Sequence, residues 1–247
     1  MRKIFLLTSF VLIGSSLISC DDDEKSTNIT QIDGEIAEFV DMGLSVKWAS
    51  WNVGASSIQE VGNHYAWAES DRKTNFEWGT YKYSNGSAST MTKYCLNGMY
   101  GKIDSLSTIQ AKSEDDTKVE LGDDVAKIEW GDNWRMPTAE EWKELLDNTK
   151  AKFYEDTVIV TQGNSLHISG YLLRSKVNNN YIILPASGYC ENNSLIGEGM
   201  YGNYWSSSLY DKANNEAVSL YFGSSYINIG HNSRFRGQSI RPVYCGK

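Results

Sequence analysis

The sequence has few of the residues from which metal and nucleophilic centres are usually built. Its three histidines, His64, His167 and His231, are far apart along the chain, and no Cys-x-x-Cys spacing joins its four cysteines. It also lacks the Gly-x-Ser-x-Gly, His-Glu-x-x-His and phosphate-loop patterns. Neighbouring carboxylates such as Asp115 and Asp116 are adjacent in sequence, which is typical of loops and helix caps rather than of a glycosidase cleft. We therefore expect no metal, no cofactor and no catalysis.

Long apolar runs are also missing, except at the beginning of the chain. Arg2 and Lys3 precede an apolar stretch from Ile4 to Leu17, which is short for a membrane span and typical of an export signal. The stretch ends in Leu-Ile-Ser-Cys20, which resembles the lipobox of bacterial lipoproteins. We expect residues 1–19 to be a cleaved signal peptide and Cys20 to carry the lipid anchor. The alternative is an ordinary secretory signal followed by a chance cysteine.

The segment after this cysteine is acidic and polar. Asp21, Asp22, Asp23 and Glu24 follow Cys20 directly, and the polar composition continues to about Gly34. Such a segment predicts a solvated tether over residues 20–34, with one folded domain over residues 35–247. The acidic run resembles the signal that sends lipoproteins of Bacteroidota to the cell surface. This resemblance implies an outer-membrane protein that faces outward, and a plain hydrophilic spacer on a periplasmic protein is the alternative.

Acidic residues outnumber basic ones overall, but the end of the chain contains none. The formal net charge is −8 at pH 7, and losing Arg2 and Lys3 with the signal brings it to −10. This balance argues against nucleic acid or an anionic membrane as the main partner. From Ala217 to Lys247 there is no acidic residue, although three arginines are present: Arg234, Arg236 and Arg241. We expect these arginines to pair with carboxylates elsewhere in the fold.

Three cysteines remain after Cys20 in a chain that is destined for an oxidising compartment. They are Cys95, Cys190 and Cys245. An odd number permits one disulfide and one leftover thiol, and the spacing does not indicate which residues pair.

The local patterns predict an α+β fold with many short antiparallel strands, one or two helices and long loops. Thr138 and Glu141 form a capping box after Pro137, and the positions of Trp142 and Leu145 predict one helix face. A shorter helix is expected after Asp123 or Asp124. Residues 81–118 are predicted to form long loops. Strands are expected over residues 44–48, 65–67, 168–173, 181–184 and 217–222.

Several blocks resemble one known family along almost the whole mature chain. They include Phe39 to Ala49, Tyr65 to Glu69, Trp134 to Thr138, Leu184 to Tyr189, Tyr204 to Ser208, and Ile240 to Val243. In this order they are similar to the Fibrobacter succinogenes major paralogous domain (FISUMP), which is common in lipoproteins of Bacteroidota. The resemblance implies a C-type-lectin-like fold, in the branch that also holds the formylglycine-generating enzymes and the variable proteins of diversity-generating retroelements.

The chain departs from the functional motifs of those relatives. It has neither the Glu-Pro-Asn or Gln-Pro-Asp triplet nor the Trp-Asn-Asp triplet of calcium-dependent lectins. Cys190 and Cys245 do not form the close pair that formylglycine-generating enzymes use. Calcium-dependent sugar binding and that oxidation are therefore not expected. Trp205 and the serines after it are interpreted as a buried strand rather than a hydroxyl-lined pocket.

Tyrosine, serine, asparagine and glycine dominate the segment from Leu220 to Arg236, a composition that is typical of recognition surfaces. In the retroelement-diversified relatives, the variable residues lie in the corresponding stretch. The resemblance therefore implies a ligand-binding surface, and a plain β-hairpin with alternating faces is the alternative. The candidate ligand contacts are Tyr221, Ser224, Tyr226, Asn228, His231 and Asn232.

Two classes of function follow. The first is a non-catalytic module at the cell surface that binds a glycan or a protein. The second is an enzyme with an unrecognised site, related to the formylglycine-generating branch, and a subunit at the tip of a surface fibre is a further alternative. The sequence favours the binding module because no nucleophile, metal or acid–base constellation is evident.

Two short patterns resemble the Asp-Ser/Thr-apolar sequon for O-glycosylation of exported Bacteroidota proteins. They contain Ser105, within Asp104-Ser105-Leu106, and Thr157, within Asp156-Thr157-Val158. We expect these two hydroxyls to be candidate modification sites.

Overall fold

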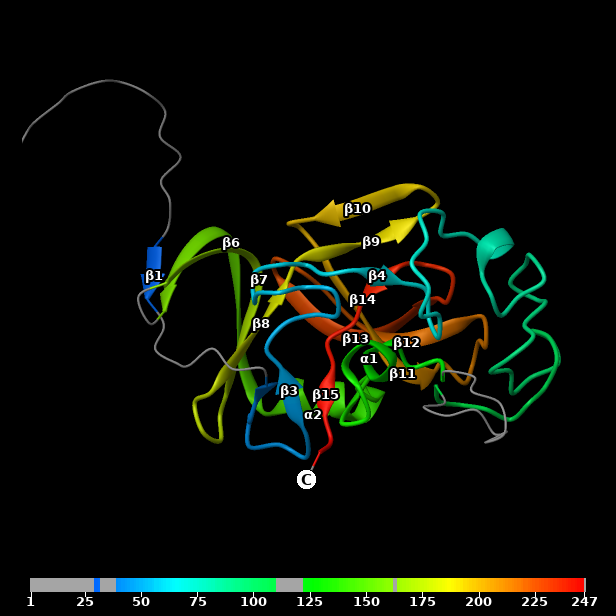
Figure 1. The fold of residues 1–247 in the computed structure, drawn as a ribbon, viewed down its shortest axis with the longest axis horizontal. Coiled ribbons are helices and arrows are strands. Elements are labelled where there is room, and N and C mark those ends of the chain that lie inside the picture. Colours follow the sequence, from blue (N-terminus) through cyan, green and yellow to red (C-terminus); the bar gives the residue numbers. More distant parts are fainter. Residues whose placement is uncertain (1–28, 32–38, 110–121, 162–163, 247) are drawn as a thin grey trace, which may run out of the picture.

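The described chain is mainly β-structure, with two short α-helices and several antiparallel and mixed sheets (Figure 1). This confirms the coarse part of the predicted α+β class. The computed structural model describes residues 29–31, 39–109, 122–161 and 164–246. The predicted signal peptide, Cys20 and most of the predicted tether lie outside these residues.

The first sheet is built around a long hairpin on the left of Figure 1. Its strands lie in the order β1 (Ile29–Gln31), β6 (Thr149–Thr161), β7 (Asn164–Ser175) and β8 (Tyr181–Pro185). β1 is parallel to β6, and the other pairs are antiparallel. Leu172 and Ile183 pack into one apolar cluster, whereas Leu173 and Ile182 pack into another. Both faces of β7 and β8 are thus buried, which explains their continuous apolar sequences.

The second sheet contains the predicted binding segment. Its main path is β10, β9, β11, β12 and β13, and β14 joins β11 to β4. The bounds are β4 (His64–Tyr65), β9 (Ser187–Glu191), β10 (Ser194–Glu198), β11 (Gly202–Leu209), β12 (Glu216–Gly223), β13 (Tyr226–Ser233) and β14 (Gln238–Ser239). β12 and β13 form an antiparallel hairpin along their whole length.

The third sheet brings the two ends of the domain together. Its order is β2 (Phe39–Val40), β3 (Lys47–Ala49), β15 (Val243–Tyr244) and β5 (Trp134–Arg135). Val243 pairs with Trp48 on one side and with Arg135 on the other. The strand predicted over residues 44–48 begins only at Lys47. Of the strand predicted over 65–67, only Tyr65 lies in a strand, β4.

Both predicted helices are confirmed. α2 (Ala139–Asp147) begins with the expected capping box, in which Thr138 Oγ1 accepts from Glu141 N at 3.1 Å and Glu141 Oε2 accepts from Thr138 N at 2.8 Å. α1 (Val125–Trp130) is capped by Asp124, whose carboxylate accepts from two backbone amides of the first turn. A short 3-10 helix, η1 (Trp78–Thr80), lies in the long loops.

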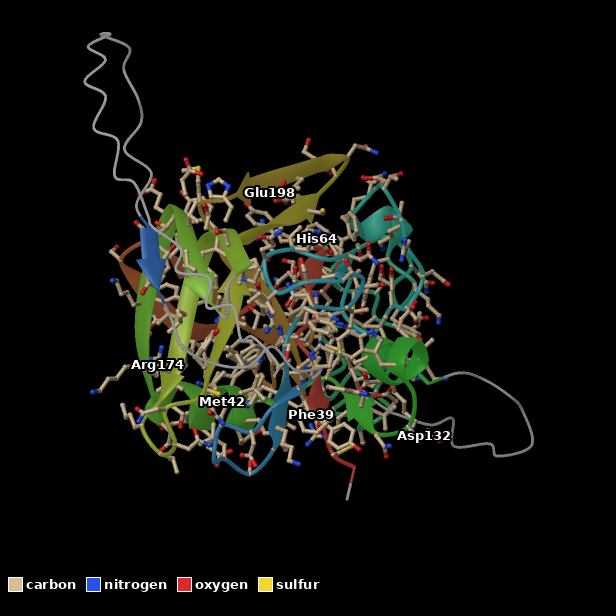
Figure 2. All side chains as sticks on the ribbon, turned by 60° about the vertical axis from the view of Figure 1, so that its left-hand side comes forward. Phe39, Met42, His64, Asp132, Arg174 and Glu198 are labelled. Atoms are coloured by element: carbon tan, nitrogen blue, oxygen red, sulfur yellow. The ribbon has the colours of Figure 1, made fainter. Side chains whose placement is uncertain are left out.

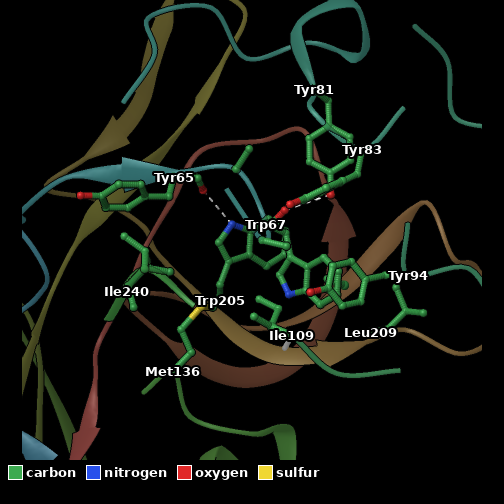
Figure 3. Packing of buried hydrophobic residues seen from close by; sticks show 14 of the residues in the cluster. Tyr65, Trp67, Tyr81, Tyr83, Tyr94, Ile109, Met136, Trp205, Leu209 and Ile240 are labelled. Atoms are coloured by element: carbon green, nitrogen blue, oxygen red, sulfur yellow. Dashed lines mark hydrogen bonds between the residues drawn. The ribbon is translucent and has the colours of Figure 1, made fainter. Parts of the chain in front are cut away.

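Long loops cover one side of the second sheet and enclose an aromatic core (Figure 3). Trp67 and Trp205 lie at its centre and are fully buried. The indole of Trp205 donates to the carbonyl of Tyr65 at 2.9 Å, and that of Trp67 donates to the carbonyl of Ser206 at 2.8 Å. Buried indole N–H groups need such partners. The interpretation of Trp205 as a core residue of a strand is therefore confirmed.

The expectation that the C-terminal arginines pair with carboxylates is wrong for two of the three. Arg241 is fully buried and donates to Asn52 Oδ1 and to the carbonyls of Ala49, Ser50 and Ile183 at 2.8 to 3.1 Å. Fully buried Arg234 likewise reaches three backbone carbonyls and one tyrosine hydroxyl. Loops, strand ends and edge strands leave carbonyls without ladder partners, and a guanidinium with five donors can satisfy several of them at once. Of these three arginines, only Arg236 forms a carboxylate pair with a described residue, Glu191, at 2.9 Å.

His64 links β4 to β9 and lies near Glu198 of β10 (Figure 2). Its Nε2 is 2.8 Å from the carbonyl of Ser187, to which the neutral ring donates. Burial lowers the pKa of His64 below its ordinary value of 6.5, although Ser187 and Glu198 oppose the shift. The unfolded chain therefore takes up this proton at a higher pH than the folded protein does.

The free energy of unfolding should accordingly fall as the pH is lowered through about 6.5, because protons favour the unfolded state there. In the His64→Gln variant, whose amide can still donate to Ser187 but cannot titrate, this decline should be shallower. Urea denaturation of both proteins at pH 7.5 and pH 5 measures the difference. Equal declines in the two proteins would contradict a role for His64.

Candidate ligand-binding face

The outward side of the β12–β13 hairpin gathers three of the predicted contacts. Tyr221 lies directly opposite Asn228, and Tyr226 lies opposite Gly223 in the next outward-facing pair. Residues opposite each other in an antiparallel pair share one face of the sheet. The alternate residues Leu220, Phe222 and Ile227 face the apolar cluster on the other side. We call Tyr221, Tyr226 and Asn228 the tyrosine face.

Two glycines make room for the tyrosine rings. A Cβ on Gly230 would lie 2.7 Å from the ring of Tyr221, and a Cβ on Gly223 would lie 2.9 Å from the ring of Tyr226. The rings therefore rest against bare backbone. Their centroids are 5.9 Å apart and their planes are inclined by 60°. Because each ring packs against the backbone, its position is restricted before a ligand binds, and the tyrosine face is partly preorganised for contact with a ligand.

The tyrosine face is exposed and uncharged. Tyr221 and Tyr226 are 37% and 42% exposed, and Asn228 is also exposed. Between Leu220 and Ser233 there is no Asp, Glu, Lys or Arg. Within the part of the chain that the structure describes, the Asn228 amide makes no side-chain hydrogen bond. Ring surface and unengaged amide atoms thus point to solvent together.

The other three predicted contacts have different surroundings. Ser224 is exposed in the turn between β12 and β13. His231 lies on the opposite face of β13, where its Nδ1 bonds Glu216 and its ring stacks on Tyr210 at 3.9 Å. Asn232 lies on the outward side, but its Oδ1 accepts from Arg236 at 2.7 Å. His231 is therefore separated from the tyrosine face, and Asn232 is partly engaged.

Tyr201 is an exposed ring at the same end of the sheet that composition did not single out. It precedes β11, whose Gly202 pairs with Phe222, and it is 39% exposed. Its ring lies against Gly197 of β10, since a Cβ there would be 2.2 Å from the ring. The sequence places Tyr201 outside the Tyr- and Asn-rich segment, so only strand pairing could have found it.

A buried polar cluster in the loops offers titratable groups, but its chemistry is structural. The carboxylate of Asp123 accepts from the hydroxyls of Tyr83 and Tyr94 and pairs with Lys93 at 2.5 Å. Burial raises the pKa of Tyr83 far above its ordinary value, and the hydrogen bond to Asp123 adds to this. The phenol stays protonated and serves as a donor. The cluster ties the loops to the start of α1.

The two predicted glycosylation sites differ in access. Ser105 is exposed and has a positive φ of 61°, as in a tight turn. Thr157 is only 4% exposed, and its hydroxyl donates to the carbonyl of Glu155 at 2.8 Å. In the folded protein, Ser105 is the accessible one of the two.

The three described cysteines, Cys95, Cys190 and Cys245, are free thiols. In the described ranges, no group of three or more His, Cys, Asp or Glu side chains is placed to hold a metal ion. No helix among the described residues has both the length and the apolar character needed to cross a membrane.

Comparisons with known proteins give one match. No curated protein and no solved structure matches the chain. Residues 160–243, about one third of the chain, match the family described as "Domain of unknown function (DUF8237)". The matched segment runs from the end of β6 to the first residue of β15 and contains the whole tyrosine face.

Proposed function

We propose that the protein is a non-catalytic binding module that the lipid on Cys20 holds at the outer membrane, facing outward. The ligand is a glycan or a protein, recognised by the tyrosine face. The lipobox, the acidic residues behind it and the Tyr- and Asn-rich segment support this proposal. Lipidation would leave the folded domain outside the bilayer, with the tether as its connection.

We also propose that the domain belongs to the FISUMP group and has a C-type-lectin-like fold. The two landmark blocks of the resemblance, Trp134 to Thr138 and Ile240 to Val243, support this because they meet in space. Arg135 of β5 pairs with Val243 of β15. The strand predicted to close the domain thus lies beside the segment that begins α2.

One observation carries the functional proposal. The tyrosine face exposes two large rings on a fully paired hairpin, although the neighbouring residues of Tyr221 in β12 are buried and several residues of β13 are half-buried. Exposed aromatic side chains on a fixed scaffold supply contact area at a low cost in conformational entropy. A plain β-hairpin without a ligand would have the same geometry. Only a binding assay therefore distinguishes the binding module from the plain hairpin.

The combined Tyr226→Ala and Asn228→Ala variant should lose affinity but keep its stability. Truncating an aromatic anchor costs about 2 kcal/mol or more of binding free energy, whereas truncating exposed side chains usually changes stability by less than about 0.5 kcal/mol. Full-length protein and variant are compared on an array of glycans and purified cell-surface proteins, and thermal melting reports the fold.

Met99→Ala is the matched control, because Met99 is a large exposed apolar side chain in the long loops. It should bind and melt like the parent. If the Tyr226/Asn228 variant bound every array ligand as the parent does, or if the parent bound nothing, the tyrosine face would not be a binding surface.

A further inference from the structure

We infer that the tyrosine face takes an uncharged glycan chain, with pyranose rings stacked on Tyr226 and Tyr221 and hydroxyls bonded to Asn228. This inference rests on the proposed function and names its ligand class. Three features of the tyrosine face support it: the two aromatic rings, the amide of Asn228, and the absence of Asp, Glu, Lys and Arg across residues 220–233.

The rings match the apolar side of a sugar. The C–H groups on one side of a pyranose carry partial positive charge, and the face of a tyrosine ring carries negative charge from its π-electrons. Because Gly223 and Gly230 leave the backbone bare under the rings, each ring lies along the sheet rather than pointing away from it. With centroids 5.9 Å apart and planes inclined by 60°, the two rings suit a chain that bends between successive sugar units.

The amide matches the hydroxyls of the same sugar. Asn228 is opposite Tyr221 and two residues from Tyr226, so its carboxamide lies on the same outward face as the two rings. A carboxamide both donates and accepts, as a hydroxyl does, and one amide can therefore bond two neighbouring hydroxyls. Ser224 and Ser225 in the adjoining turn are exposed and add further small hydroxyl groups at the rim.

Charge separates neutral from anionic glycans. The charged groups closest in sequence are already engaged: Glu216 with His231 on the other face of the hairpin, fully buried Arg234 with backbone carbonyls, and Arg236 with Glu191. A sulfate or carboxylate on the tyrosine face would lose hydration without gaining a cationic partner. The net charge of −8 would also repel a polyanion.

Size separates a glycan from a protein partner. A stable protein interface buries about 800 Å² on each side and has a broad apolar centre. On the hairpin, the large exposed apolar surface is limited to the two tyrosine rings. Two rings and an amide are enough for one or two sugar units of a chain.

The test is affinity electrophoresis of the full-length protein in a polyoxyethylene detergent, which contains no sugar. The neutral probes are mannan, dextran, xyloglucan and galactomannan, and the anionic probes are polygalacturonate and chondroitin sulfate. A parallel array carries enzymatically deglycosylated cell-surface proteins. At least one neutral polymer should retard the parent, and Tyr226→Ala should raise the dissociation constant about tenfold or more.

Tyr226→Phe keeps the ring and should bind within a few-fold of the parent, which distinguishes stacking from bonding through the hydroxyl. Met99→Ala should bind as the parent does. The inference is overturned if no neutral polymer retards the parent. It is also overturned, while the proposed binding function stands, if Tyr226→Ala abolishes binding only to anionic polymers or to deglycosylated proteins. Binding that Tyr226→Ala leaves unchanged throughout overturns both.

Discussion

Replacing Arg241 with alanine is expected to lower the free energy of unfolding by about 4 kcal/mol or more, because it leaves several buried acceptors without a hydrogen-bond donor. The guanidinium holds Asn52 Oδ1 and the carbonyls of Ala49, Ser50 and Ile183. Each unsatisfied buried acceptor costs about 1–3 kcal/mol, although relaxation recovers part of this. Ile183 belongs to the first sheet and Ala49 to the third, so the loss should loosen the contact between these sheets.

Arg241 remains charged at pH 7 although it is buried. Burial lowers the pKa of Arg241 to about 10, which still leaves the group charged at pH 7. Arg241→Lys keeps a charge but has three donors without the planar fork, so its stability should lie between the parent and the alanine variant. Urea denaturation followed by tryptophan fluorescence measures all three proteins. An alanine variant within about 1 kcal/mol of the parent would show that water replaces the guanidinium.

Replacing Trp205 with alanine should cost about 3–5 kcal/mol, because a fully buried indole leaves a cavity that the surrounding structure only partly fills. Trp205 joins the second sheet to the long loops: it packs beside Met136 and Ile240, and its Nε1 donates to Tyr65 (Figure 3). The loss should therefore be felt across the whole aromatic core rather than in β11 alone.

Two further variants make the Trp205 result specific. Trp205→Phe retains most of the buried ring but not the donor, so it should lose clearly less stability than the alanine variant. Trp130→Ala removes the same kind of side chain at a half-buried site and should also lose less. Denaturation of the full-length variants compares them. Equal losses of unfolding free energy in Trp205→Ala and Trp130→Ala would mean that the burial of Trp205 does not determine how much stability is lost.

Local features of the chain were predictable where a few neighbouring residues decide the outcome. The start of α2 follows from Thr138 and Glu141, and the start of α1 follows from Asp124, because each cap is made within one turn. The strands at residues 168–173 and 181–184 were predictable from their apolar content. In contrast, β6 carries Lys150, Lys152 and Glu155 and was not predicted; its pairing with β7 holds it extended.

The predicted binding segment shows the same contrast between local pattern and tertiary structure. Its composition of tyrosine, asparagine, serine and glycine predicts an exposed surface typical of recognition, because those residue types rarely fill a core together. Composition does not contain the strand register, however. The register places Tyr221 and Asn228 side by side and sends His231 to the opposite face, where Glu216 and Tyr210 engage it.

By itself, the sequence determined the caps, the apolar strands and the neutral Tyr- and Asn-rich segment, because these depend on residues that are close along the chain. The tertiary structure decided which of those residues meet. Arg241 was expected to find a carboxylate, but it is surrounded by carbonyls of segments almost sixty or more positions away in the chain. Such partners are set by how strands and loops that are distant in sequence pack against one another, which local patterns do not encode.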